Sequence, residues 1–234
     1  MQVLSHKRLA SITLAVTCAV LAWDLSGLDM PMARWFGGPG GFVLQDNWFL
    51  ARVLHDGMRY LAWAFALLLC LGVWFPQGWL KPLGIRRRLQ LAMTALSAVS
   101  LVGLAKAVSH TSCPWSLSDF GGIARYVSHW SSLLVADGGG SGGCFPAGQA
   151  AVGFAFVGGY FAFRHDAPVL ARRWLAVSLL AGLLVGLSQQ ARGAHFMSHT
   201  LWTGWLCWCA AWAIDGLMQR VSLAHVSADL GETA

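Results

Sequence analysis

The chain has 234 residues, of which 56% are hydrophobic and only 11% are charged. Because a soluble domain averages about 25% charged residues, this composition excludes an ordinary soluble domain and indicates a membrane protein. The formal net charge is +6, but no recognisable nucleic-acid-binding module accompanies it, so we expect no nucleic-acid partner.

Six apolar stretches are long enough, or nearly long enough, to cross a bilayer as helices. They lie near residues 9–28, 58–76, 89–109, 148–164, 174–190 and 197–217. The sequence therefore predicts an all-α, polytopic membrane protein with six transmembrane helices and no β-sheet. These spans leave no room for a second, soluble domain, so we expect residues 1–234 to form a single integral membrane domain. Residues 218–234 are polar and are expected to form a frayed inner tail.

The basic residues predict how the chain is oriented. With the N-terminus inside, most of the 16 Lys and Arg residues fall in the inner segments. The densest cluster, Arg86-Arg87-Arg88, then lies in a short inner loop, as the positive-inside rule requires. We therefore expect an inner (plasma) membrane protein with both termini inside.

Two outer segments separate the predicted spans on the other side of the membrane. In the first, residues 29–57, the run from Trp48 to His55 predicts a short amphipathic helix at the membrane interface. The second, residues 110–147, is the largest outer loop, and its glycine run at 137–143 predicts a flexible segment.

Two of the six cysteines, Cys113 and Cys144, lie in the larger outer loop. An oxidising outer compartment would allow them to form a disulfide. Such a bridge would connect the end of the third predicted span to the start of the fourth. The other cysteines lie within spans, where we expect small buried apolar groups: Cys18, Cys70, Cys207 and Cys209.

Three polar clusters fall at the outer ends of predicted spans. Lys106 ends the third span, Gln149 begins the fourth, and the run from Ser188 to His199 precedes the sixth. Polar and ionisable residues are costly at bilayer depth, so such clusters indicate a functional site. Because all three lie on one side, we expect them to form one site that faces the periplasm or exterior.

The order and spacing of these clusters resemble the three motifs of the type 2 phosphatidic acid phosphatase superfamily. These motifs are K-x6-R-P, P-S-G-H and S-R-x5-H-x3-D. The resemblance covers residues 106–204, roughly the catalytic half of the chain. The matching positions are Lys106 and Pro114, Pro146 and Gly148, and Ser188 and His195.

The chain departs from these motifs at five positions. Cys113 replaces the arginine of the first motif. Ala147 and Gln149 replace the serine and histidine of the second, and Gln189 and His199 replace the arginine and aspartate of the third. These departures remove two guanidinium groups, one carboxylate and one imidazole from the expected site.

The resemblance implies a phosphatase that acts on a lipid phosphate or diphosphate at the outer leaflet. Candidate substrates are phosphatidylglycerol phosphate, undecaprenyl diphosphate and lipid A. His195 would attack phosphorus to form a phosphohistidine, and His199 would orient its other ring nitrogen. Gln149 stands where the superfamily has its acid, and losing one general acid typically costs about 10²–10⁴ in rate. We expect no metal or other cofactor.

The phosphate oxygens need cationic and N–H donors. The expected cations are Lys106 and Arg192, with Arg125 as a third, and Arg192 would replace a lost arginine. Backbone N–H groups near Ala147 and Gly148 would add an anion site at the start of a helix.

Two other interpretations remain open. Gln149, whether natural or engineered, also fits a catalytically impaired or non-catalytic protein that binds lipid phosphates. His195 and His199 have the i, i+4 spacing of a zinc pair that His110 could join, which favours a metal site less strongly.

Overall fold

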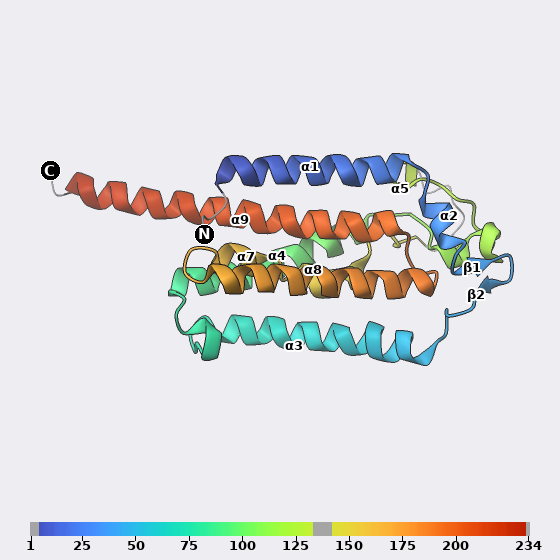
Figure 1. Ribbon diagram of the computed structural model, residues 1–234, viewed down its shortest axis with the longest axis horizontal. Helices are drawn as coiled ribbons and strands as arrows, with labels where there is room; N and C mark the ends of the chain where they lie inside the picture. The colour runs from blue at the N-terminus through green and yellow to red at the C-terminus, as the bar shows by residue number, and fades with distance from the viewer. Residues whose placement is uncertain (1–4, 133–141, 233–234) are drawn as a thin grey trace.

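The computed structural model of the protein describes residues 5–132 and 142–232, with side chains described through residue 221. Most of the glycine run predicted to be flexible therefore lies outside the described residues. The structure is 71% helical, which confirms the all-α class. Figure 1 shows long helices running side by side, with several short elements gathered at one end.

Four helical segments are long and apolar enough to cross a membrane, and they identify a multi-pass membrane protein. They are α1 (His6–Leu25), the continuous η1 (Phe49–Gly57) and α3 (Met58–Leu71), α4 (Ile85–Ala107) and α8 (Pro168–Ala191).

The other two predicted spans correspond to different kinds of helix. The fourth is a shorter apolar helix at residues 148–163, built from η5 (Gly148–Ala150), α6 (Ala151–Phe154) and α7 (Gly158–Phe163). The sixth lies in α9 (Met197–Glu232), which extends past the other helices in Figure 1. The helical backbone of α9 continues through Glu232, into the segment that the sequence predicts to be an inner polar tail.

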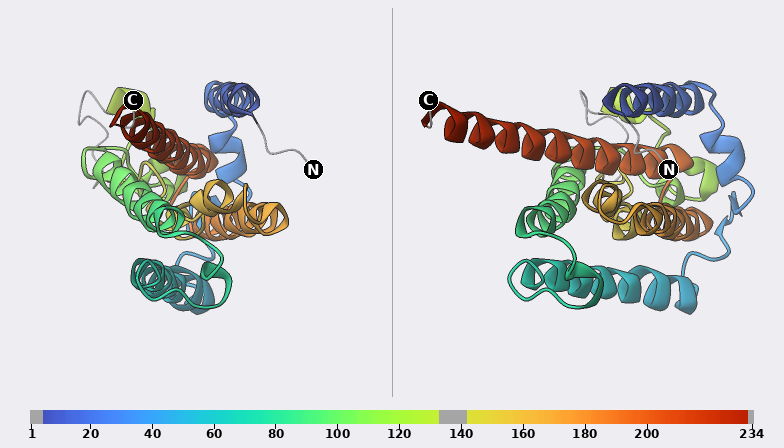
Figure 2. Two further views of the ribbon diagram at one scale, coloured as in Figure 1. Left: turned by 90° about the vertical axis from the view of Figure 1, so that its left-hand side faces the viewer. Right: turned by 60° about the vertical axis from the view of Figure 1, so that its left-hand side comes forward.

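The helices form a central group, and α1 and α3 lie outside it. Figure 2 shows α1 and α3 on opposite sides of the central helices. The main apolar core lies chiefly among α4, the 148–163 helix and α9, and includes Leu91, Val157, Phe161 and Phe163. Many large apolar side chains of α1 and α3 point outward instead, for example Leu14 and Leu68. A surface of this kind suits contact with lipid rather than water.

A buried carboxylate joins the central helices at the end opposite the short elements. Asp215 of α9 is fully buried. It accepts hydrogen bonds from Arg164 Nη2 at 2.6 Å, Gln90 Nε2 at 2.9 Å and Gln219 Nε2 at 2.7 Å. Because a buried charge must be paired, this network constrains how α4, the end of α7 and α9 meet.

The expectation of no β-sheet is wrong at one small hairpin. Strands β1 (Gly37–Gly38) and β2 (Gly41–Phe42) pair antiparallel, with Gly37 opposite Phe42. The physical reason is the Gly/Pro turn at residues 39–40, which reverses the chain and brings the two strands together. Phe42 is buried and its ring centroid lies 4.8 Å from that of Phe120.

The remaining short elements lie mostly at this same end of the molecule (Figure 1). They are α2 (Asp29–Ala33), η3 (Pro114–Ser116), η4 (Ser118–Phe120) and α5 (His129–Ser132). The exception is η2 (Gly78–Leu80), which connects α3 to α4 at the other end. The Asp29 carboxylate of α2 accepts hydrogen bonds from the hydroxyl of Ser198 and, at 3.0 Å, from its backbone N–H. This contact fixes where α9 begins.

The predicted interfacial helix near residues 48–55 is not a separate element. Its residues form η1, a π-helical segment that continues directly into α3. Its polar side chains Arg52 and His55 line a cavity that most of the predicted site residues also line.

Candidate active site

A cavity of about 850 Å³ lies between η1–α3, α4, the 148–163 helix and the turn after α8. Its apolar wall comes from α3, α4 and α6. Its polar wall is built from both halves of the chain. The charged and amide side chains that line it are Asp46, Arg52, His55, Asp56, Arg59, Lys106, Gln149, Gln189, Arg192 and His195.

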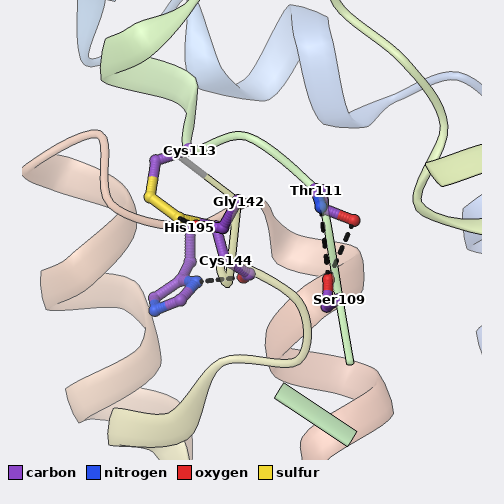
Figure 3. Close-up of a disulfide and its surroundings, with 6 residues drawn as sticks. All are labelled: Ser109, Thr111, Cys113, Gly142, Cys144 and His195. Carbon is purple, nitrogen blue, oxygen red and sulfur yellow. Dashed lines mark hydrogen bonds between the residues drawn. A yellow bond between two sulfur atoms is a disulfide. The ribbon is translucent and has the colours of Figure 1, made fainter. Parts of the chain in front are cut away.

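His195 is held in a single tautomer at this cavity. Its Nδ1 lies 2.7 Å from the carbonyl oxygen of Cys144 (Figure 3). A carbonyl oxygen can only accept, so Nδ1 carries the proton and Nε2 keeps its lone pair. Burial, and after it the Lys106 ammonium, lower the pKa of His195 to about 3. At neutral pH the ring is therefore uncharged and nucleophilic at Nε2.

The turn that carries His195 depends on Gly193, two residues earlier in the chain. Gly193 has a φ of +75°, a left-handed conformation that glycine adopts readily and other residues rarely do. A Cβ atom at this position would also overlap the ring of Phe42. The carbonyl of Gly193 accepts a hydrogen bond of 2.9 Å from the backbone N–H of Trp115, which joins the third motif to the first.

A disulfide joins the first motif to the second. Cys113 and Cys144 are bonded, with their Cα atoms 5.2 Å apart, so the predicted bridge is confirmed (Figure 3). The cysteine that stands in place of an arginine therefore has a structural role. Because the carbonyl of Cys144 holds His195, the bridge also helps to place the His195 ring.

Arg192 lies beside Gln189, the residue that stands at the position of the third motif's arginine. Its Nη1 donates to Gln189 Oε1 at 3.2 Å, and its Nε donates to the carbonyl of Gln45 at 2.9 Å. Its guanidinium carbon lies 6.0 Å from the centre of the Trp115 ring. These contacts hold a permanent positive charge at the cavity wall.

Lys106, Gly148 and Gln149 meet at the other side of the cavity. A Cβ atom placed on Gly148 would lie 3.5 Å from Lys106 Cδ, so the glycine leaves room for the lysine side chain. All three residues line the cavity with His195. The structure thus brings together the main residues of all three predicted motifs.

Three predicted site residues lie elsewhere. Arg125 is exposed and does not line the cavity. The Ala147 backbone N–H donates to the carbonyl of His199 at 3.2 Å, so it is not available to an anion. His199 is only 1% exposed and lies behind the cavity wall, with its ring centroid 5.8 Å from that of His195.

His195 Nδ1 is paired with the carbonyl of Cys144 and not with His199, the partner expected from the sequence. His195 lies in the turn before α9 begins at Met197, so the i, i+4 relation of a helix does not apply to these two residues. The carbonyl of Cys144 orients His195 instead. His199 Nδ1 is buried and has no hydrogen-bond partner in the described part of the chain.

The cavity also contains a charged cluster that the sequence analysis did not assign to the site. It consists of Arg52, His55 and Asp56 of η1 and Arg59 of α3. Asp56 lies 2.9 Å from His55 Nδ1, 3.2 Å from Arg52 Nη1 and 3.7 Å from Arg59 Nη2. The amphipathic pattern of residues 48–55 is the sequence signal for this cluster, although the pattern alone predicts a helix at the membrane interface.

The alternative of a histidine metal site requires at least one further ligand near His195 and His199. Among the side chains that the structure describes, no three of His, Cys, Asp or Glu gather closely enough to hold a metal ion. His110 is exposed and is not among the residues that line the cavity.

Comparison with known protein families identifies the chain. A family model described as the PAP2 superfamily matches residues 87–222, more than half of the sequence. The chain belongs to the PAP2 superfamily. Members of PAP2 are phosphatases, which places this PAP2 protein among the phosphoric ester hydrolases. No curated protein and no solved structure matches the chain. The PAP2 match includes the turn with His195 but not η1, so the η1 cluster lies outside the shared region.

Proposed function

We propose that this PAP2 protein is an integral membrane phosphatase that removes phosphate from a lipid phosphate or diphosphate at the outer leaflet. The observation that carries this proposal is the state of His195 in the cavity. Its Nδ1 is bound to the carbonyl of Cys144, and its Nε2 keeps a lone pair. Lys106 and Arg192 line the same cavity and supply positive charge for the phosphate oxygens.

The proposed reaction begins with attack of His195 Nε2 on phosphorus. The ester bond breaks and a phosphohistidine forms, which water then hydrolyses. Lys106 and Arg192 stabilise the charge on the oxygens in both steps. The side-chain amide of Gln149 and the backbone at Gly148 add hydrogen-bond donors at the start of the 148–163 helix.

The two walls of the cavity support a lipid as the substrate. One wall is cationic and polar, whereas Ala62, Trp63, Ala66, Leu96 and Val99 contribute apolar surface. Trp63 is 55% exposed on α3, at the outside of the bundle. A phosphate headgroup suits the first wall and an acyl or prenyl chain suits the second.

The proposed setting is an inner (plasma) membrane crossed six times, with both termini inside. Four segments already have the length and composition of spans, and the 148–163 helix and α9 would complete the six. With this orientation the cavity opens toward the periplasm or exterior, because Lys106, His195 and η1 lie at the ends of segments that emerge there.

Phosphate release from defined lipids tests the proposal. The full-length protein in nanodiscs should release phosphate from at least one of phosphatidylglycerol phosphate, undecaprenyl diphosphate or lipid A. His195→Ala should reduce release to background, because the nucleophile is lost, and it should abolish an acid-labile, base-stable phosphoenzyme. His165→Ala serves as the control, since His165 is exposed and lies outside the cavity. Activity that survives in His195→Ala would contradict the mechanism, and loss on adding a chelator would favour a metal site.

The second candidate function is binding of a lipid phosphate without catalysis. The observation that favours it is Gln149 in the cavity, because an amide has no titratable proton near neutral pH. Saturable binding of these lipids without phosphate release, weakened by Arg192→Ala, would support this alternative.

A further inference from the structure

The cavity contains a nucleophile and cations, but the residue at the superfamily's acid position is an amide. When His195 displaces an aliphatic alcohol, the leaving oxygen must gain a proton, and histidine is the side chain that most often supplies one. The arginines that line the cavity keep their protons. His55 and His195 are the two histidines among the described residues that line it.

His55 is oriented by a carboxylate next to it in the chain. Its Nδ1 lies 2.9 Å from Asp56 Oδ1, and the two side chains are 32% and 27% exposed. Asp56 is held in turn by Arg52 and Arg59, at 3.2 Å and 3.7 Å. Because a carboxylate accepts, Nδ1 carries a proton and Nε2 is the nitrogen that can exchange one with a substrate.

His55 lies near the proposed nucleophile even though they are far apart in the chain. The segment η1 packs against α8, whose C-terminal turn leads to His195. His55 and His195 both line the same cavity. The groups that share the cavity with His55 are Arg52, Asp56 and Arg59 beside it, Asp46 before η1, and Lys106, Arg192 and His195 from the other walls.

We propose that His55 is the catalytic acid of this site and supplies the proton that position 149 cannot. This inference rests on the proposed phosphatase function. It assigns a role to a residue outside the region that matches the PAP2 superfamily, and Asp56 is its positioning residue.

The two steps balance with His55 as the only proton carrier. In the first step, Nε2 of His195 bonds to phosphorus and the P–O bond breaks. The leaving oxygen keeps the electron pair of that bond and takes the Nε2 proton of cationic His55. The products are the free alcohol, neutral His55 and phosphorylated His195. In the second, neutral His55 accepts a proton from water as the oxygen attacks phosphorus. The P–N bond breaks and its electron pair returns to Nε2 of His195. Inorganic phosphate then leaves, and His55 is again protonated.

Two substrates that differ in their leaving group test this role. An alkyl phosphate needs a proton on its leaving oxygen, whereas the nitrophenolate of 4-nitrophenyl phosphate leaves without one. In the first turnover, before water attacks the phosphohistidine, His55→Gln should therefore slow release of the aliphatic alcohol by about 10²–10⁴-fold and change release of the nitrophenolate little. The exposed His165→Gln is the matched control and should leave both rates unchanged. Equal losses on both substrates, or no loss on either, would overturn the proposal.

Placing a histidine at position 149 in the His55→Gln variant provides a second test. A gain of activity in that variant cannot result from damage to its folding. Gln149→His should restore alkyl phosphate release in the His55→Gln background, because it returns an imidazole to the cavity. In the unaltered background the same change should raise alkyl phosphate release by a much smaller factor than in the His55→Gln background, since His55 already supplies the proton. A large gain in the unaltered background would show that the site lacks an acid and would overturn the proposal. If the unaltered protein releases no phosphate from either substrate and forms no phosphoenzyme, the proposed function itself fails and this inference fails with it.

Discussion

At the scale of single residues, the structure makes His195 a neutral buried base. Its ring is only 6% exposed and donates to the carbonyl of Cys144. Charging such a ring is costly because the cation would lose water without gaining an acceptor at Nε2. The same burial that favours nucleophilic attack therefore makes the folded state sensitive to acid.

We expect the free energy of unfolding to fall as the pH is lowered from 7 to 5. The pKa of His195 is about 3 in the folded protein, whereas a histidine in an unfolded chain has a pKa of about 6.5. The unfolded state thus binds the extra proton. The contribution of neutral His195 to the free energy of unfolding is fully present above the unfolded-state pKa. It decreases as the pH falls from that pKa toward the folded-state pKa. One such histidine costs about 1.4 kcal/mol for each pH unit below the unfolded-state pKa.

Unfolding measured at several pH values in His195→Gln checks this expectation. The variant should lose this part of the pH dependence, whereas the exposed His110→Gln should keep it. An unchanged slope in His195→Gln would show that the ring is not buried as a neutral base.

At the scale of elements, close packing of two helices supports the site. A Cβ atom on Gly153 of α6 would overlap the backbone of Gly182 in α8. A Cβ atom on Gly182 would overlap the ring of Phe154. Small residues at such a crossing let two helix backbones approach closely. This contact places the 148–163 helix, which carries Gln149 in its first turn, against the helix that carries Gln189.

Gly182→Ala should lower the melting temperature and disturb the cavity. An inserted methyl group in a tightly packed crossing typically costs about 1–3 kcal/mol. Gly103→Ala in α4 is the matched control, because a Cβ atom there would meet nothing within 4 Å, and it should be neutral or stabilising by about 1 kcal/mol through helix propensity. Thermal unfolding of both variants measures the difference. A Gly182→Ala variant as stable as Gly103→Ala would refute the close crossing.

At the scale of the whole molecule, the cavity and the Asp215 network lie at opposite ends of the helices. The short elements gather around the cavity end (Figure 1). The basic cluster at residues 86–88 lies at the start of α4, far along that helix from Lys106. The charge distribution therefore predicts that the cavity end is outside.

Labelling of two single cysteines checks this orientation in intact cells. Ile123 is 90% exposed at the cavity end, and Ile85 is 55% exposed at the other. In a background without the four free cysteines, Ile123→Cys should react with an impermeant maleimide. Ile85→Cys should react only after the membrane is permeabilised. The reverse pattern would place the cavity inside and contradict the proposed topology.

The sequence by itself determined the features that depend on local composition. Runs of apolar residues predict helices, and the helical class, the α1, α4 and α8 segments and the Cys113–Cys144 bridge are found in the structure. The motif order also indicated that Lys106, Gln149 and His195 share a site, because helix ends on one side of a membrane lie near each other.

Only the tertiary structure decided which groups contact one another at that site. His195 is bound by a carbonyl 51 residues away, and Arg192 by a carbonyl 147 residues away. Arg52, His55 and Asp56 of η1 line the cavity, whereas Arg125 does not. Hydrophobic periodicity shows that a segment has a polar face, but what that face contacts depends on how distant segments pack.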